Sequence, residues 1–219
     1  MVTYNESVFI GHTVIALATI SFIFKYRKVD FPSKIIGFLL CLTFLNERIA
    51  DYCAHVFNNS IIVYGAFSPI QLLLISWYFN NSIRFFHKKN IGLKIGIPFC
   101  ILGYVNYFFV QGPKVMNSYF LLTESILVVG MSMYAFYRMM LEDEGVELMK
   151  YPHFWFTSFF LLFWLGTFFI WGLYDFVIRQ LHIDSDILRA VLLAMNVITY
   201  VGIAFIYLFY PKMNVSHEQ

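Results

Sequence analysis

Charged residues are scarce in this chain of 219 amino acids, and this scarcity excludes an ordinary soluble domain. Only 13% of the residues are Asp, Glu, Lys or Arg, whereas 60% are hydrophobic and 21% are aromatic. A soluble globular domain carries about 25% charged residues. The composition therefore predicts a polytopic membrane protein without a separate soluble domain, and the lipid bilayer is its first expected partner.

Cysteines are also few, and their spacing excludes two kinds of site. The chain contains only Cys41, Cys53 and Cys100, and no CxxC pair occurs. Neither a disulfide framework nor a thiolate metal site is therefore expected.

Residues 1–9 contain no Lys or Arg, so the basic segment of a cleaved signal peptide is missing as well. We therefore expect the first helix to be retained.

Sequence motifs for catalysis and nucleotide binding are missing too. No P-loop, GxGxxG sequence or Ser-His-Asp order occurs. The last apolar run contains no Lys that could form a Schiff base with retinal. The sequence therefore predicts a protein that is not an enzyme, has no cofactor and does not bind nucleic acid.

Long apolar runs are abundant, and seven of them reach the length of about 20 residues that a helix needs to cross a bilayer. Proline and serine mark several of their ends. Pro32 precedes the second run, Ser68-Pro69 is expected to start the third, and Pro98 is expected to kink the fourth. The sequence thus predicts an all-α fold in which residues 1–219 form one transmembrane domain. The seven predicted spans are residues 7–25, 34–57, 68–86, 92–110, 117–140, 152–178 and 186–210.

Basic residues are distributed unevenly between the two sets of loops. The loops that follow the second, fourth and sixth runs, with the start of the last run, hold only Lys114, Arg179 and Arg189. The other set is richer: its first two members contain Lys25, Arg27, Lys28, Lys34, Arg84, Lys88, Lys89 and Lys94. Because cytoplasmic loops carry the excess of Lys and Arg, we expect the N-terminus outside and the C-terminus in the cytoplasm.

Ionisable residues interrupt the second run and form the main candidate site. Glu47, Asp51 and His55 are spaced at i, i+4 and i+8, so on a helix they share one face, and Arg48 precedes Asp51 by three residues. Each such group costs roughly 2.5–3.5 kcal/mol at the centre of a membrane helix. The two carboxylates also repel each other, so Arg48, a shared proton, a cation or another helix must compensate them.

Two interpretations of this acidic stripe (Glu47, Asp51 and His55) stay open. It is either an internal ion pair that holds helices together or a binding site for a ligand or an ion. Together with Glu124, the stripe also offers enough side chains for a metal ion. We favour a proton or Arg48 as the compensating group, so no metal is expected.

Polar side chains in other runs lie at a similar expected depth. At a rise of about 1.5 Å per residue, they fall about 5–15 Å below the outer ends of their runs. Clustering in the outer half favours a water-accessible cavity that opens outside, because hydrogen bonds that merely join helices would be scattered over the whole depth. The residues expected at this level are Glu47, Asp51, Gln71, Asn106, Glu124 and Asn196.

Several short stretches, taken together, resemble one family. They are residues 44–47, 64–71, 118–119, 124–125, 134–138 and 152–155, with Asn196 and Tyr200. They resemble a family of small seven-helix membrane proteins of Bacteroidetes, and the resemblance covers most of the chain. It implies a bacterial inner-membrane protein that acts beside a sensor histidine kinase. The family commonly has Glu at the position of Gln71, so a role for an acid there does not carry over.

The sequence therefore predicts a non-enzymatic sensor or receptor-like signalling protein with a polar pocket open to the outside. The pocket would bind a small ligand or an ion, and the turn at residues 141–151 would contact a cytoplasmic partner such as a histidine kinase. The alternative is a channel, transporter or pore-type effector, in which the same residues line a path for ions or protons. The predicted site residues are Glu47, Arg48, Asp51, His55, Gln71, Asn106, Glu124 and Asn196.

Overall fold

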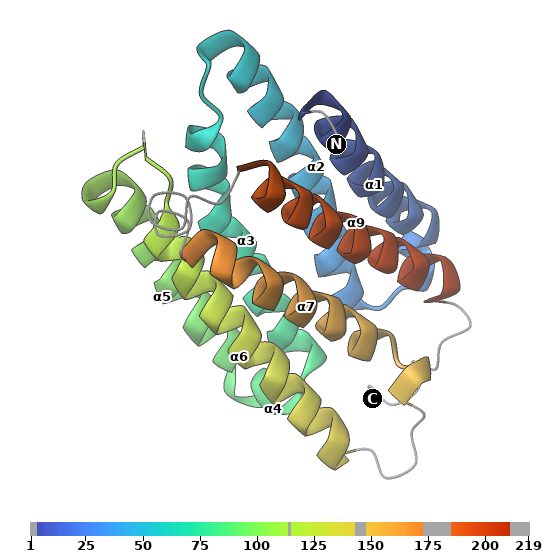
Figure 1. The fold of residues 1–219 in the computed structure, drawn as a ribbon. Helices are drawn as coiled ribbons and strands as arrows, with labels where there is room; N and C mark the ends of the chain where they lie inside the picture. The colour runs from blue at the N-terminus through green and yellow to red at the C-terminus, as the bar shows by residue number, and fades with distance from the viewer. Residues whose placement is uncertain (1–3, 114, 143–147, 173–184, 211–219) are drawn as a thin grey trace. The chain divides into compact units, whose positions relative to one another are not determined.

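The computed structural model describes residues 4–113, 115–142, 148–172 and 185–210, and every regular element in these ranges is a helix (Figure 1). The contacts divide the chain into two compact units. One unit is Asp30–Glu124, and the other combines Met1–Val29 with Ser125–Gln219. Each unit is held together by its own helix contacts.

Five of the described helices are long and apolar enough to cross a membrane. They are α1 (Tyr4–Lys25), α3 (Ile61–Ser82), α5 (Ile91–Val105) with the π-helical turn Asn106–Val110, α6 (Ser118–Glu142) and α9 (Ser185–Phe209). The remaining long helices are α2 (Phe31–Phe57), which carries the acidic stripe, and α7 (Pro152–Gly172), which ends where the described part of the chain stops.

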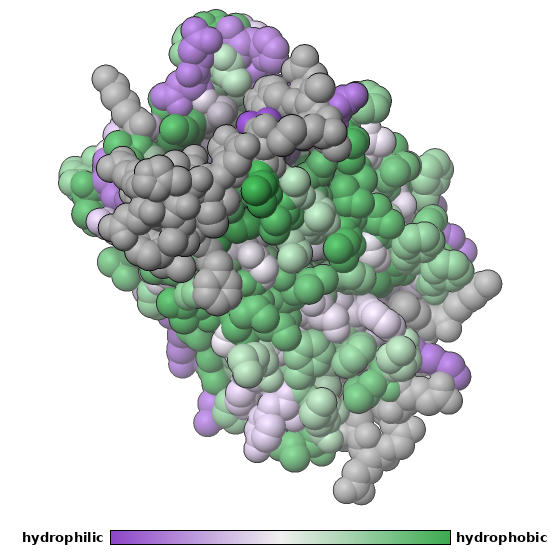
Figure 2. Space-filling view, in the orientation of Figure 1, coloured by the Kyte–Doolittle hydropathy of each residue, from purple (hydrophilic) through white to green (hydrophobic). Residues whose placement is uncertain are grey.

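Large apolar side chains cover much of the exposed surface, as the face in Figure 2 shows. Phe24 is 79% exposed and Phe109 is 83% exposed. Contiguous exposed apolar surface of this kind is rare on soluble monomers and marks contact with a membrane or a partner. The surface therefore agrees with the helix lengths in favouring a lipid environment.

The third predicted span was placed too late in the chain. Instead of residues 68–86, the structure has α3 from Ile61 to Ser82, with Pro69 inside it, followed by the short helix α4 (Arg84–Lys89). A proline lacks the N–H that would bond back to the preceding turn. Hydroxyl donors reach the carbonyls of that region: Tyr104 donates to the Ala66 oxygen at 3.0 Å and Tyr107 to the Ile62 oxygen at 3.1 Å. Proline is tolerated inside packed membrane helices, and these two bonds tie α5 and the π-helical turn to the part of α3 that precedes Pro69.

Other helix boundaries differ less. Pro32 lies within the first turn of α2 instead of before it, and Asp30 is the N-cap, because its Oδ1 accepts a hydrogen bond from the Ser33 N–H at 3.0 Å. The fourth span changes at Asn106 from an α-helix to a π-helical turn. Residues 173–178 of the sixth predicted span lie outside the described part of the chain.

In the unit Asp30–Glu124, α2 and α3 run antiparallel (Figure 1). The rings of Phe31, at the start of α2, and Trp77, near the end of α3, have centroids 5.9 Å apart. At the opposite end, Tyr64, the fourth residue of α3, forms a hydrogen bond with Glu47 in the second half of α2. This pairing brings the acidic stripe to the first turns of α3.

Two glycines allow α3 and α5 to cross closely, and we name this contact the α3–α5 crossing (Gly92 and Gly96 against Ser76 and Asn80). A Cβ atom at Gly92 would lie 2.3 Å from the Ser76 backbone oxygen, and one at Gly96 would lie 2.7 Å from the Ser76 Cβ. The glycines are four residues apart, which is the GxxxG spacing of close membrane-helix packing. Since Tyr104 contacts the other end of α3, α5 is also antiparallel to α3.

In the other unit, α9 packs beside both α1 and α7. The fully buried Tyr207 of α9 joins them, because its ring centroid lies 5.3 Å from that of Phe22 on α1 and 5.4 Å from that of Phe156 on α7. His153, at the start of α7, is also fully buried, with its ring centroid 5.3 Å from that of Tyr151. Aromatic packing thus forms much of this core.

Candidate functional site

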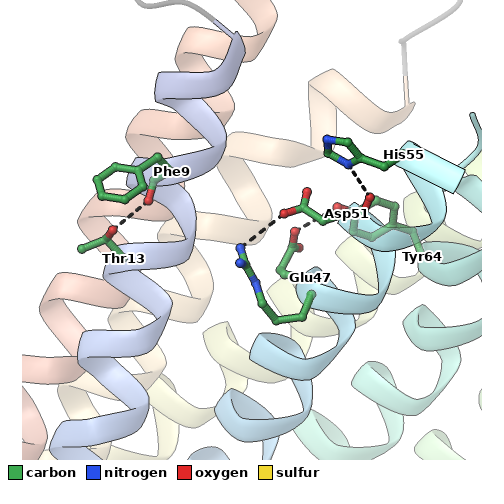
Figure 3. A network of polar contacts seen from close by, with 7 residues as sticks. Phe9, Thr13, Glu47, Asp51, His55 and Tyr64 are labelled. Carbon is green, nitrogen blue, oxygen red and sulfur yellow. Dashed lines mark hydrogen bonds and ion pairs between the residues drawn. The ribbon is translucent and has the colours of Figure 1, made fainter.

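The acidic stripe lies in the second half of α2, and its most important contact leaves that helix. The Tyr64 hydroxyl donates a hydrogen bond to Glu47 Oε2 at 2.9 Å (Figure 3). Glu47 is half-buried and Tyr64 is 43% exposed. A hydrogen bond to a charged group is worth about 1.5–3 kcal/mol where it is well shielded from water. This bond fixes the side-chain direction of Glu47 toward α3.

Arg48, which was expected to compensate at least one of the two carboxylates, contacts Asp51. Arg48 Nη2 donates to Asp51 Oδ2 at 3.3 Å, and the two side chains are 46% and 30% exposed. A helical pair of this spacing contributes about 0.2–0.5 kcal/mol in water. His55 Nδ1 lies 2.8 Å from the Asp51 backbone oxygen, one turn earlier (Figure 3). Glu47 and Asp51 therefore have different partners, a hydroxyl of α3 for Glu47 and the Arg48 guanidinium for Asp51.

A second polar group, which we name the amide cluster, is formed by Asn106, Gln111, Asn117 and Ser118. Asn106 Nδ2 donates to Gln111 Oε1 at 2.8 Å and also to Asn117 Oδ1. Gln111 Nε2 donates to Ser118 Oγ at 3.0 Å, and Gln111 Oε1 accepts from the Tyr119 N–H at 3.2 Å. Gln111 thereby satisfies an N–H group in the first turn of α6, where no backbone partner exists. The cluster joins the π-helical turn to the start of α6.

Tyr107 connects the amide cluster region with α3. It is 2% exposed, and its ring packs against Gly65, where an added Cβ would lie 2.4 Å from the ring Cε2. Its hydroxyl bonds the Ile62 oxygen, two residues before Tyr64. The first turns of α3 are therefore held on one side by Tyr64 and Glu47 and on the other by Tyr107. We name this region the polar end: Glu47, Tyr64, Tyr107 and the amide cluster.

Glu124 has a different environment from the other predicted site residues. It is 0% exposed, and neither carboxyl oxygen has a hydrogen-bond partner in the described part of the chain. One turn earlier, Phe120 packs against Gly103 of α5, since an added Cβ at Gly103 would lie 2.6 Å from the ring Cε2. Glu124 is thus located on the buried face of α6 and does not line an exposed pocket.

Gln71 and Asn196 have no contact with the acidic stripe among the described hydrogen bonds. Gln71 is half-buried on α3, two turns beyond Tyr64, and its side chain forms no hydrogen bond with a described residue. Asn196 is half-buried on α9, which belongs to the other unit. Within the described ranges, no three His, Cys, Asp or Glu residues come together as a metal site.

Five residues of the polar end were missed as site residues in the sequence: Tyr64, Tyr107, Gln111, Asn117 and Ser118. Tyr64 is one of 15 tyrosines, and its partner Glu47 is 17 residues away, so no local pattern could single it out. Gln111 and Asn117 flank a short turn, where amides are ordinary. Their contacts depend on the π-helical turn, for which the sequence has no clear signal.

No family model, no curated protein and no solved structure matches this chain. The resemblance to the Bacteroidetes membrane proteins therefore stays a prediction. Its implied histidine-kinase partner and inner-membrane location stay predictions as well.

Proposed function

We propose that this chain is a polytopic membrane protein that acts as a sensor or receptor-like signalling component, and that the polar end binds its small ligand or ion. The observation that carries this proposal is the hydrogen bond from Tyr64 to Glu47. It connects an ionisable group inside a helix of membrane length to a neighbouring helix. Ionisable residues in such a setting mark functional sites more often than ordinary packing.

The proposed orientation has the polar end outside and seven helices across the membrane. Both α2 and α5 are neighbours of α3 and run antiparallel to it. The start of α2, the end of α3 and the start of α5 therefore share one end of the unit Asp30–Glu124. Basic residues gather there, opposite the polar end, and the positive-inside rule assigns such an end to the cytoplasm. These residues are Lys34, Arg84, Lys88, Lys89 and Lys94.

The proposed signal passes along contacts within this unit. A ligand that binds Glu47 competes with the Tyr64 hydroxyl and changes the position of the first turns of α3. Those turns contact Tyr107, whose neighbour Asn106 belongs to the amide cluster at the start of α6. A rearrangement at Glu47 can therefore reach α6 through directly contacting groups, as coupling between distant sites requires.

The second candidate is a channel or transporter, and the packing of α3 argues against it. Toward the basic end, α3 buries a series of large side chains, each 1% exposed or less: Leu72, Ile75, Tyr78 and Phe79. Ser76, which could continue a polar path, is 0% exposed, and Thr43 bonds its own helix through the Leu39 oxygen at 2.8 Å. A receptor needs this closure, whereas a conductor needs it to open.

Proteoliposomes with the purified protein separate the two functions. We expect no flux of Na⁺, K⁺ or H⁺ above that of empty liposomes, with or without a membrane potential. Glu47→Gln should instead change the melting temperature and the ligand response, and Glu6→Gln, at the exposed start of α1, is the matched control. A robust ion flux that Glu47→Gln abolishes and Glu6→Gln retains would refute the sensor proposal and establish the conductor.

A further inference from the structure

Glu124 is an acidic residue outside the polar end, and it is fully buried. Both of its oxygens lack a partner among the described residues. An ionised carboxylate without compensation in a low-dielectric interior costs so much that the group takes up a proton instead. The neutral carboxylic acid is therefore the form that fits this packing.

Within the described part of the chain, nearby groups do not offer Glu124 a compensating charge. On α6 itself, Arg138 is 14 residues away, about 21 Å along the helix axis. On α5, the tyrosine hydroxyls of residues 104 and 107 already donate to oxygens of α3. None of the titratable groups on α6 or on the helices shown to contact it donates a hydrogen bond to Glu124. Among the described side chains, these groups are Lys94, Cys100, Tyr104, Tyr107, Tyr119, Tyr134, Tyr137, Arg138 and His153.

Buried side chains flank this position on α6. Phe120 is 4% exposed and Val128 is 0% exposed, and they lie one turn before and one turn after Glu124. A proton neutralises the carboxyl without requiring further volume on this packed face.

We propose that Glu124 is an exchangeable-proton site, neutral while the face of α6 is closed and ionised only when that face opens to water. Asn117 of the amide cluster directly precedes α6. It is 2% exposed and lies seven residues, about two turns, before the fully buried Glu124. Opening at the amide cluster therefore gives water its way to the carboxyl. This inference is independent of the sensor function, because it needs neither Glu47 nor a ligand.

Infrared spectroscopy of the full-length protein in liposomes tests the neutral carboxyl directly. At neutral pH we expect an absorption band of a protonated carboxylic acid that Glu124→Gln removes and Glu47→Gln leaves in place. Gln is the nearest neutral isostere, so Glu124→Gln should fold with an unchanged melting temperature. An unchanged band in Glu124→Gln, or failure of that variant to fold, would overturn the proposal.

Transfer to D₂O tests whether opening controls exchange. The band should shift slowly in the wild-type protein, over a time long enough to follow. Asn106→Ala removes two hydrogen bonds of the amide cluster and should speed the shift at least several-fold. Ser158→Ala, which removes a hydroxyl bonded within α7, should leave the rate unchanged. An immediate shift in the wild type, or equal rates in all three proteins, would show that no opening is required.

Discussion

Replacing Gly92 by Ala should separate α3 from α5. The new Cβ would lie 2.3 Å from the Ser76 backbone oxygen and 2.9 Å from the Asn80 backbone nitrogen. Neither atom can move without moving α3, unlike the end of a flexible side chain. Overpacking of this kind costs about 1–3 kcal/mol. The intrinsic preference for Ala over Gly in a helix returns about 0.5–1 kcal/mol, so the net loss should be about 1–2 kcal/mol.

The assay is thermal unfolding of purified variants in one detergent, followed by circular dichroism. Gly130→Ala is the matched control, because a Cβ there meets nothing within 4 Å on the same type of helix. It should be neutral or slightly stabilising. Gly92→Ala should melt several degrees lower than this control.

A second pair of variants distinguishes a backbone clash from a side-chain clash. A Cβ at Gly96 would meet the Ser76 side chain, with 2.7 Å to its Cβ. Ser76→Gly should therefore rescue Gly96→Ala, but it should not rescue Gly92→Ala, which meets the backbone. If Gly92→Ala is as stable as Gly130→Ala, or if Ser76→Gly rescues it fully, the α3–α5 crossing is wrong.

Two further predictions concern the acidic stripe. Tyr64→Phe removes the donor to Glu47 and should lower the free energy of unfolding by about 0.5–1.5 kcal/mol, because Tyr64 is partly exposed. The control Tyr119→Phe, at an exposed tyrosine, should have no effect in the same melting assay. Arg48→Met removes the partner of Asp51 and should lower the free energy of unfolding by less than 1 kcal/mol in low salt and by almost nothing in high salt, as expected for a partly exposed pair. A large, salt-independent loss of stability would show that the pair is shielded from solvent.

Local spacing predicted the parts of this protein that depend on one helix. The contact between Arg48 and Asp51 follows from an i, i+3 separation, and the apolar runs predict the helices of the described ranges because burial or lipid contact selects such runs. The pattern of Gly92 and Gly96 could also have predicted the α3–α5 crossing.

Contacts between helices could not be predicted in the same way. Pro69 was assigned to a helix start by a rule for isolated helices, but it lies inside α3, whose preceding turns contact tyrosines more than 30 residues later. Glu124 was grouped with Glu47 by depth alone. Depth does not say which way a side chain points, and the structure shows Glu124 fully buried where Glu47 reaches a neighbouring helix.

The claim that the polar end is a water-accessible site facing outside is tested most directly by thiol labelling in intact cells. In a variant without Cys41, Cys53 and Cys100, single cysteines are placed at Glu47, Ser60 or Lys88 and exposed to a membrane-impermeant maleimide. Cysteines at positions 47 and 60 should react from outside, and the one at position 88 only after the cells are opened. Labelling at 88 in intact cells, or no labelling at 47 when 60 reacts, would contradict the proposed orientation or the proposed site.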